Sequence, residues 1–364
     1  MVAVCAAVSA CTGAVATAAP STSTTNTAAL PPISLDVMSF NLAACAYTEP
    51  GPPQQKCDGD QGRVKHLDDI VNQTSTAGAG NETVSYDFVA TQEADLLTDR
   101  SPRTSGLLFQ GARQGDGERP CLKASRDLRP AGEPFSAPKT NGMCINFGNP
   151  ANTSDDPATL LKLMYDATRW AIDTTPYYQF IGQDKYRRAA GIAHFTHKSA
   201  NGTDDRGVYI VDTHWPTNGA GNREVTMQMI DAYKQANKTI AKHDDPIIFM
   251  GDFNHEFITY RGNEVSNVED FSPAHPGYFH NANAEQLAGG RDKTFHNFTY
   301  EFTEPIPAKP KTDINPRMID FIFYTSPLVL RHTEILHSPA QRNFDTAHGL
   351  ASDHFPVTAS FLLP

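Results

Sequence analysis

The stretch Pro246-Ile247-Ile248-Phe249-Met250-Gly251-Asp252-Phe253-Asn254 says most about how this chain folds. Its apolar run is typical of a buried strand. Because strand residues two apart share a face, we expect Asp252 and Asn254 side by side, with Phe253 turned away. Gly251 lets another backbone or a ligand come close. A carboxylate beside a carboxamide suits water activation near an oxyanion, although a plain strand end with a capping residue has the same pattern.

Polar residues recur at the ends of other predicted strands or inside them. The pattern predicts strands at 33–40, 86–93, 191–197, 207–213, 318–324 and 357–363, and helices at 63–71, 159–172 and 222–243. The polar residues are Asn41, Glu93, His214, Asp320, Asp353 and His354. Each alone also fits a turn, a solvated strand end or a structural hydrogen bond. Together they favour a site at one edge of a sheet in a layered α/β protein.

The chain is acidic, with 30 Lys and Arg against 41 Asp and Glu and a formal net charge of −11. Such a chain is a poor candidate for non-specific clamping of nucleic acid, which depends on releasing counterions from phosphates. A bound cation could still supply positive charge at a local site. A hydrophobic content of 39% is compatible with a large buried core.

The amino-terminal region has the composition of a targeting segment. Residues 1–19 are expected to be a signal peptide, although no Lys or Arg lies near Met1. Residues 20–32 are rich in Ser, Thr, Ala and Pro and are expected to be flexible. Residues 33–364 are expected to form one domain, with an irregular insertion at about 100–157. We therefore expect a secreted, extracellular protein.

Cysteines and glycosylation triplets are consistent with that expectation. Four cysteines follow the signal segment: Cys45, Cys57, Cys121 and Cys144. An even number in a secreted chain indicates two disulfides, and of three connectivities we favour pairing of sequence neighbours. A zinc site is the alternative, but the spacings do not match one. Asn-x-Ser/Thr triplets begin at Asn72, Asn81, Asn152, Asn201, Asn237 and Asn297.

Taken in order, the motifs resemble those of the endonuclease/exonuclease/phosphatase superfamily, which has the DNase I-like fold. They are Met-Ser-Phe-Asn, Gln-Glu, Thr-His, Gly-Asp-Phe-Asn, Ile-Asp-Phe-Ile-Phe and Ser-Asp-His-x-Pro, spread over residues 33–364. The resemblance implies an α+β protein, a four-layer α/β sandwich of two packed mixed β-sheets flanked by helices. It also implies phosphoester hydrolysis that depends on Mg²⁺ (or Mn²⁺).

The resemblance also implies roles for single residues. Glu93, Asn41 and Asp353 would form the metal site, and their oxygens are ligands that a hard divalent cation prefers. Asp252 would orient or deprotonate the attacking water, and Asn254 would contact the phosphate. His354 would contact the phosphate too, with Asp320 on its other ring nitrogen. His214 resembles a histidine near the phosphate or the leaving oxygen. The tyrosine that some members place on the phosphate has no evident counterpart here, and His214 is the expected substitute for it.

The function expected from this resemblance is a secreted, metal-dependent phosphodiesterase, in the first place a DNase I-like nuclease. The basic residues are scattered, which weakens the case for nucleic acid as the substrate. A sphingomyelinase-like enzyme, or another phosphoesterase acting on phospholipids or small molecules, is one alternative. A catalytically silent binding or effector protein on the same fold is the other. Nucleic acid is the first expected partner and phospholipid the second, with a monomeric protein.

Overall fold

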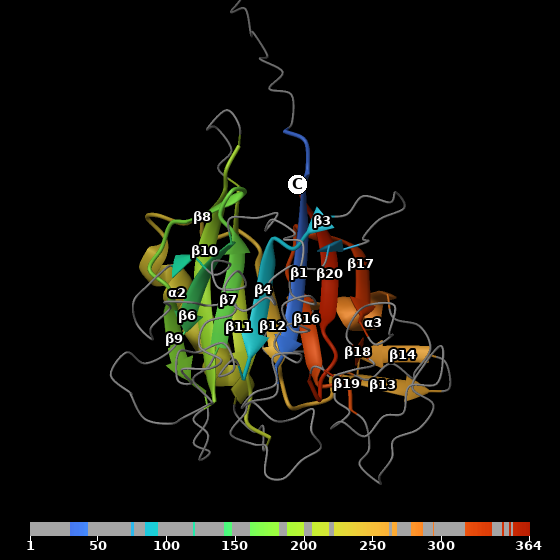
Figure 1. The fold of residues 1–364 in the computed structure, drawn as a ribbon. Helices are drawn as coiled ribbons and strands as arrows, with labels where there is room; N and C mark the ends of the chain where they lie inside the picture. Colours follow the sequence, from blue (N-terminus) through green and yellow to red (C-terminus); the bar gives the residue numbers. More distant parts are fainter. Residues whose placement is uncertain are drawn as a thin grey trace, which may run out of the picture. The chain divides into compact units, whose positions relative to one another are not determined.

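Two seven-stranded β-sheets make up most of what the computed structural model describes (Figure 1). The described residues are 30–42, 74–75, 84–93, 119–120, 142–147, 161–181, 188–199, 206–217, 222–261, 264–267, 278–286, 294, 317–336, 344–345, 349–350 and 352–364. All helices and strands among them belong to the unit Pro32–Pro364.

The first sheet has its long strands in the middle. In order across the sheet the strands are β17 (Val329–Ile335), β20 (Val357–Leu363), β1 (Ile33–Asn41), β4 (Phe88–Gln92), β7 (Leu161–Asp166), β6 (Gly142–Phe147) and β5 (Arg119–Pro120). Strands β1 and β4 are parallel, and the other neighbours are antiparallel. The sheet is therefore mixed, as expected.

The second sheet is mixed in the same way. Its order is β15 (His280–Asn281), β16 (Asp320–Tyr324), β12 (Ile247–Asp252), β11 (Gly207–His214), β10 (Ala189–His197) and β8 (Trp170–Ile172), and β9 (Tyr177–Phe180) also pairs with β10. Only β11 and β12 are parallel. Three small ribbons complete the strands: β2 (Thr74–Ser75) with β3 (Val84–Ser85), β13 (Ile258–Arg261) with β14 (Glu264–Asn267), and β18 (Phe344–Asp345) with β19 (Gly349–Leu350).

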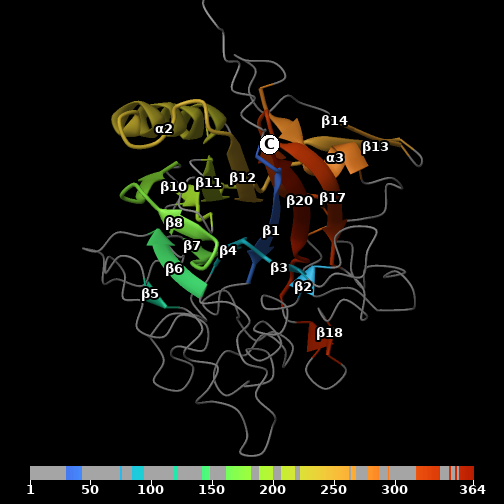
Figure 2. The same cartoon turned by 90° about the horizontal axis from the view of Figure 1, so that it is seen from above.

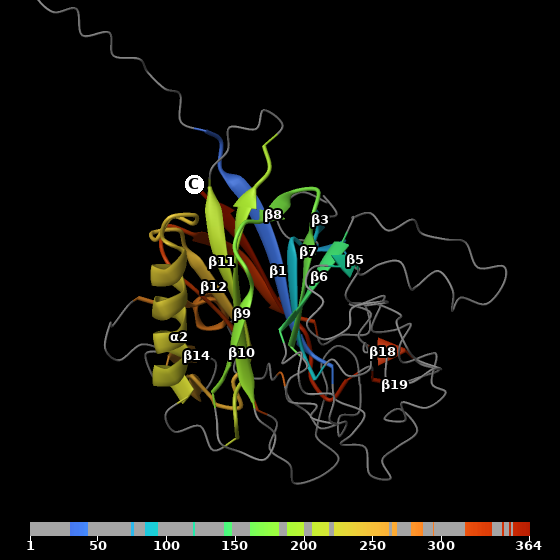
Figure 3. The same ribbon diagram turned by 90° about the vertical axis from the view of Figure 1, so that its left-hand side faces the viewer.

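The two large sheets pack face to face around one apolar core. Val37 and Phe88 of the first sheet and Ile210 and Phe321 of the second are fully buried in the same cluster. Helix α2 (Asn222–Asn237) covers the outer face of the second sheet (Figures 2 and 3), and its buried residues include Met229, Ile230 and Tyr233. A short helix, α3 (Ala282–Gln286), follows β15. None of the helices in the described segments could cross a membrane.

Most of the strand predictions are confirmed. The stretch 247–252 is the fully buried strand β12, 189–197 and 207–214 form the antiparallel pair β10–β11, and 357–363 is the last strand. The helix predicted over 222–243 exists but ends at Asn237.

The helix predicted over 159–172 is wrong, because this segment forms β7 and β8. Leu161, Leu163 and Tyr165 face the core, while Lys162 and Met164 on the opposite face are buried too. Burial on both faces hides the alternation by which a strand is recognised. The described residues of the expected insertion at about 100–157 form β5 and β6, which extend the first sheet.

Other expectations lie outside the described residues. These are the signal segment, the helix at 63–71, Cys45, Cys57 and Cys121, and the acceptors Asn72, Asn81, Asn152, Asn201 and Asn297. Cys144 is in β6, but its side chain is not described. Asn237 is the last residue of α2, and its Nδ2 donates to the carbonyl of Tyr233 at 2.9 Å.

Candidate active site

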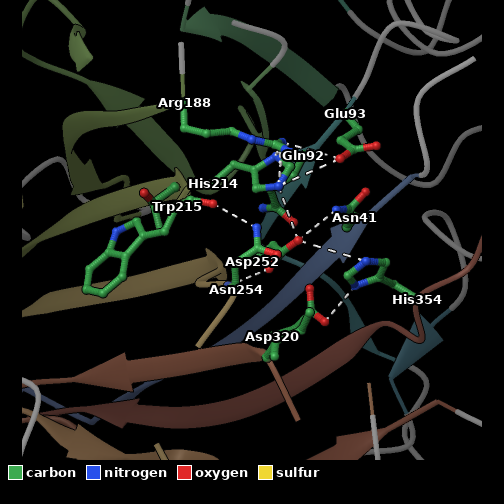
Figure 4. Close-up of polar contacts among 12 residues, drawn as sticks. Asn41, Gln92, Glu93, Arg188, His214, Trp215, Asp252, Asn254, Asp320 and His354 are labelled. Carbon is green, nitrogen blue, oxygen red and sulfur yellow. Dashed lines mark hydrogen bonds and ion pairs between the residues drawn. The ribbon is translucent and has the colours of Figure 1, made fainter. Parts of the chain in front are cut away.

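Strand direction brings the predicted residues to one edge of the sandwich. His214 pairs with Asp252 in the β11–β12 register, and Asp252 pairs with Asp320 in the β12–β16 register. In the first sheet Asn41 pairs with Gln92, and Glu93 follows directly. Strand β20 runs antiparallel to β1, so His354, just before β20, reaches the same edge. The structure thus gathers side chains that are far apart in sequence (Figure 4).

Gly251 is needed where β11 and β12 come together. Its φ is 152°, and a Cβ there would lie 2.0 Å from the carbonyl oxygen of Thr213. Both facts exclude larger residues, because L side chains rarely adopt this φ and no space exists for the carbon. The close approach predicted for Gly251 is therefore to a neighbouring backbone, and it holds His214 beside Asp252.

Asp252 is the buried centre of the site. Its Oδ2 accepts a hydrogen bond from Asn41 Nδ2 at 2.9 Å, and it lies 3.2 Å from His214 Nε2 and 3.9 Å from His354 Nε2. Burial alone would raise the pKa of Asp252, but the charge and hydrogen bond of His214, the charge of His354 and the backbone N–H of Asn254 lower it below its usual range. The carboxylate is therefore ionised at neutral pH.

Asn254 lies next to Asp252, but through a turn. Strand β12 ends at Asp252, and Asn254 has a φ of 49°. Its backbone N–H donates to Asp252 Oδ1 at 2.8 Å, and its Nδ2 donates to the carbonyl of Trp215 at 2.7 Å. Our expectation that strand alternation would place the Asp252 and Asn254 side chains on one face is therefore wrong. Phe253 is turned into the core, as predicted.

His354 and Asp320 form a buried pair, as the resemblance implied. His354 Nδ1 lies 2.8 Å from Asp320 Oδ2. Burial would lower the pKa of His354, but Asp320, Asp353 and Asp252 raise it to about 10. Burial raises the pKa of Asp320, and His354 opposes that shift. The proton between the two belongs to the imidazole at neutral pH, so His354 presents a cation beside Asp252.

Arg188 belongs to the site and was missed by the sequence reasoning. Its Nη1 contacts the His214 ring, 2.5 Å from Nε2, and donates to Glu93 Oε1 at 3.3 Å. Arg188 and His214 are almost completely buried, and Glu93 is 12% exposed. The only sequence signal was the position of Arg188 directly before β10. It supplies a second cation at the edge where Glu93 and Asp252 supply negative charge.

Gln92 and Asp212 form a second buried contact that the sequence did not reveal. Gln92 Nε2 donates to Asp212 Oδ1 at 2.7 Å, and neither residue is exposed. Gln92 precedes Glu93, and Asp212 is two residues before His214 on β11. The hydrogen bond therefore joins the two sheets directly beside the Glu93–Arg188–His214 group.

Two sets of residues could hold a metal ion. Asp252, Asp320 and His354 have possible ligand atoms within 4.8 Å of one another. His354 Nδ1 is bonded to Asp320 Oδ2 at 2.8 Å, so a cation in this set would have to displace the proton that the two side chains share. The other set is the predicted one, in which the Nδ2 of Asn41 donates to Asp252 Oδ2 and its side-chain oxygen lies on the side of Glu93 (Figure 4). The Oδ1 atom of Asp353, the third predicted ligand, lies 3.9 Å from His354 Nε2.

Comparisons with known proteins agree with this architecture. A structure of an endonuclease/exonuclease/phosphatase from Bacteroides vulgatus is similar, with 16% identity, a TM-score of 0.52, and coverage of 91% of this chain and 100% of that one. A family protein from Bacteroides thetaiotaomicron has 14% identity, a TM-score of 0.53 and coverage of 92% and 97%. A mannosyl-6-phosphatase from Bacteroides thetaiotaomicron VPI-5482 has 15% identity, a TM-score of 0.50 and coverage of 90% and 100%.

At these identities the structural likeness shows the fold alone. No curated protein sequence matches the chain significantly. The model of the Endonuclease/Exonuclease/phosphatase family matches residues 38–354, which span the site from the end of β1 to His354. The chain therefore belongs to the endonuclease/exonuclease/phosphatase family, whose members hydrolyse phosphoesters.

Proposed function

We propose that this protein is a metal-dependent phosphodiesterase that attacks its substrate with an activated water, and that nucleic acid is the first substrate to test. The observation that carries the proposal is the state of Asp252. It is buried, it is kept ionised by His214, and it lies within 3.9 Å of the cationic His354. An ionised carboxylate next to a cation can orient an attacking water beside a phosphoryl group and accept its proton.

The other side chains divide between the phosphate and a cation. His354 and Arg188 would hold the phosphoryl oxygens by charge-assisted hydrogen bonds, and Asn254 would add a neutral donor. Arg188, in contact with His214, would take the task of the missing tyrosine together with that histidine. Glu93, Asn41 and Asp353 would hold Mg²⁺ or Mn²⁺, which when bound neutralises phosphate charge. With the cation in place, an acidic protein can accept an anionic substrate.

The experiment is an activity panel with duplex DNA, RNA, bis-p-nitrophenyl phosphate and sphingomyelin, each with Mg²⁺ and with chelator. Asp252→Asn keeps the shape of the side chain and should reduce kcat at least ~100-fold, which is typical of losing a general base. Asp244→Asn makes the same chemical change at a fully exposed residue and should leave kcat unchanged. Chelator-resistant turnover, or an Asp252→Asn enzyme as fast as wild type, would refute the mechanism. No turnover of any phosphoester would favour the binding protein.

A phosphomonoesterase is the second candidate. Arg188 and His354 place two cationic groups at the site, and two cations match the two charges of a phosphate monoester. One solved structure of this fold is that of a mannosyl-6-phosphatase. Adding p-nitrophenyl phosphate and mannose 6-phosphate to the panel separates the two functions, because a phosphomonoesterase would turn these over faster than the diester.

Secretion is proposed on the sequence alone. The signal-like residues 1–19 and the acceptor triplets support an extracellular protein with N-linked glycans and two disulfides. Expression in a eukaryotic secretory host tests this by three readouts. We expect an amino terminus near residue 20, a mass that falls on enzymatic deglycosylation and no reactive thiols before reduction. An uncleaved protein retained in the cells would contradict the proposal.

A further inference from the structure

Thr294 lies where the two segments that carry Asp320 and His354 meet. It is fully buried and belongs to no helix or strand. Its backbone N–H donates to the carbonyl of Arg317 at 3.1 Å, and its carbonyl accepts from the N–H of Phe355 at 2.7 Å. Thr294 therefore ties the residues that lead into β16 to the residue that follows His354.

The Thr294 hydroxyl adds a second tie, directly at Asp320. Its oxygen accepts hydrogen bonds from the backbone N–H groups of Ile319 and Asp320, both at 3.1 Å. The hydroxyl still has its own proton to donate. One acceptor within reach is the carbonyl of Arg317, at the long distance of 3.5 Å.

The other acceptor is the carboxylate of Asp320. Its Oδ2 is bonded to His354, while its Oδ1 is buried and has no hydrogen bond to any described residue. The charge of His354 and, more weakly, the Thr294 hydroxyl lower the pKa of Asp320 against the effect of burial. A buried carboxylate oxygen without a donor is costly, and the Thr294 hydroxyl is a donor close enough to lower the pKa of that carboxyl.

We propose that Thr294 is a positioning residue that sets the orientation of the His354 imidazole, acting through Asp320 on one side and the Phe355 backbone on the other. The ring of His354 can point Nε2 at a substrate only if its Nδ1 partner stays in place. Groups that orient a histidine in this way commonly change activity roughly 10- to 100-fold when removed. The catalytic consequence rests on the proposed function, whereas the geometric role does not.

The test compares two substitutions of Thr294. Thr294→Val keeps the shape and removes the hydroxyl, while Thr294→Ser keeps the hydroxyl and removes a methyl group. We expect kcat to fall roughly 10-fold in Thr294→Val with KM changed less than ~2-fold, and to recover in Thr294→Ser. The matched control is Thr333→Val, which removes a buried hydroxyl bonded to the carbonyl of Thr358 in the β17–β20 pair and should leave kcat unchanged.

A second readout does not need activity. The His354 Nδ1 proton, shared with a buried carboxylate, should give a low-field imidazole N–H signal in the NMR spectrum, and loss of that signal in Asp320→Asn assigns it. Thr294→Val should shift or broaden it, and Thr294→Ser should restore it. An unchanged signal in Thr294→Val, or a Ser variant as impaired as the Val variant, overturns the proposal. If the wild type hydrolyses no phosphoester, the proposed function fails while the NMR comparison still decides the role of Thr294.

Discussion

At the residue scale, Arg188 illustrates how one side chain serves two neighbours. Its Nη1 contacts the His214 ring and lies 3.3 Å from Glu93 Oε1. A planar guanidinium can hold both while offering further donors to a phosphate, and an ammonium cannot reproduce that geometry. Arg188 therefore links His214, on the side of the proposed base, to Glu93, one of the expected metal ligands.

We predict that Arg188→Lys raises KM about 10-fold, which corresponds to ~1.4 kcal/mol and to the loss of about one charge-assisted hydrogen bond. The effect on kcat should be smaller, because Asp252 and His354 remain in place. Steady-state kinetics on the best substrate of the panel measures both constants. Arg331→Lys, an exposed position in β17, is the control and should match wild type. An unchanged KM in Arg188→Lys would exclude Arg188 from substrate binding.

Asp212 is a buried acid that lowers stability at neutral pH. Burial raises its pKa well above 3.8, and the hydrogen bond from Gln92 only partly opposes this. Above pH 3.8 the unfolded chain releases the proton while the folded protein still holds it. Stability therefore falls as pH rises toward the folded pKa.

We predict that Asp212→Asn, which removes this titration and keeps the shape, is more stable than wild type at pH 7.5 by about 1 kcal/mol or more, with a smaller difference at pH 4.5. Urea unfolding at the two pH values measures the difference. Asp244→Asn, at an exposed position, should show no such trend. Equal stabilities of Asp212→Asn and wild type at pH 7.5 would mean that folding does not raise the pKa of Asp212.

Sequence reasoning found the site residues that end strands and missed those that depend on packing between strands. Asp252 and Asp320 were predicted because they end or interrupt apolar runs, and His354 because it shortly precedes the last predicted strand. Gln92 and Asp212 contact each other across the two sheets, 120 positions apart, and no local pattern shows such a contact. Thr294 escaped notice for the same reason, since its partners lie at 317–320 and 355.

At the element scale, a buried histidine connects strand β10 to two neighbouring segments. It pairs with Tyr209 in β11, five positions before His214. His194 Nδ1 lies 2.8 Å from Asp173 Oδ1, and His194 Nε2 lies 2.9 Å from Asp245 Oδ2. Asp173 follows β8, and Asp245 lies between α2 and β12. The His194 imidazole therefore joins three segments around the second sheet.

Burial would lower the pKa of His194, but hydrogen bonds and charges of Asp173 and Asp245 raise it above 6.5. The stabilisation of the folded state by these two ion pairs is fully present below pH 6.5. It is lost as the pH rises through the pKa that His194 has in the folded protein. We predict that the free energy of unfolding of His194→Gln is lower than that of wild type by about 1 kcal/mol at pH 6. This difference should become smaller toward pH 9. Urea unfolding across this range measures it. His243→Gln, whose side chain is 57% exposed, is the control; a constant gap would contradict the pairing.

Strands were predictable where one pattern dominated. β12 and β20 are short apolar runs bounded by Pro or turn residues, and the hairpin β10–β11 has a polar, Gly-containing connection. β7 was mistaken for a helix because its residues are buried on both faces, so their spacing fits either period. The polar residues at strand ends were enough to predict that the site lies at one edge of a sheet. The order of strands in each sheet depends on contacts between distant segments, and a single sequence does not show these.

At the scale of the whole molecule, the site joins both sheets of a chain with 30 basic and 41 acidic residues. His214, Asp252 and Asp320 come from the second sheet. The expected metal ligands are Asn41, Glu93 and Asp353, which lie at the ends of β1, β4 and the segment before β20, all in the first sheet. Two of these three residues are carboxylates, so a divalent cation would balance their charge.

A ligand that binds only the folded state stabilises it by RT ln(1 + [L]/Kd), or about 2.7 kcal/mol at one hundred times Kd. We therefore predict that millimolar Mg²⁺ or Mn²⁺ raises the Tm of the chelator-treated protein by a few °C. Glu93→Gln removes one expected ligand charge and should abolish most of that shift. Glu256→Gln changes an exposed acid two residues after Asn254 and should keep the full shift. Equal shifts in the two variants would show that the cation binds elsewhere, while no shift in wild type would remove the metal from the proposed mechanism.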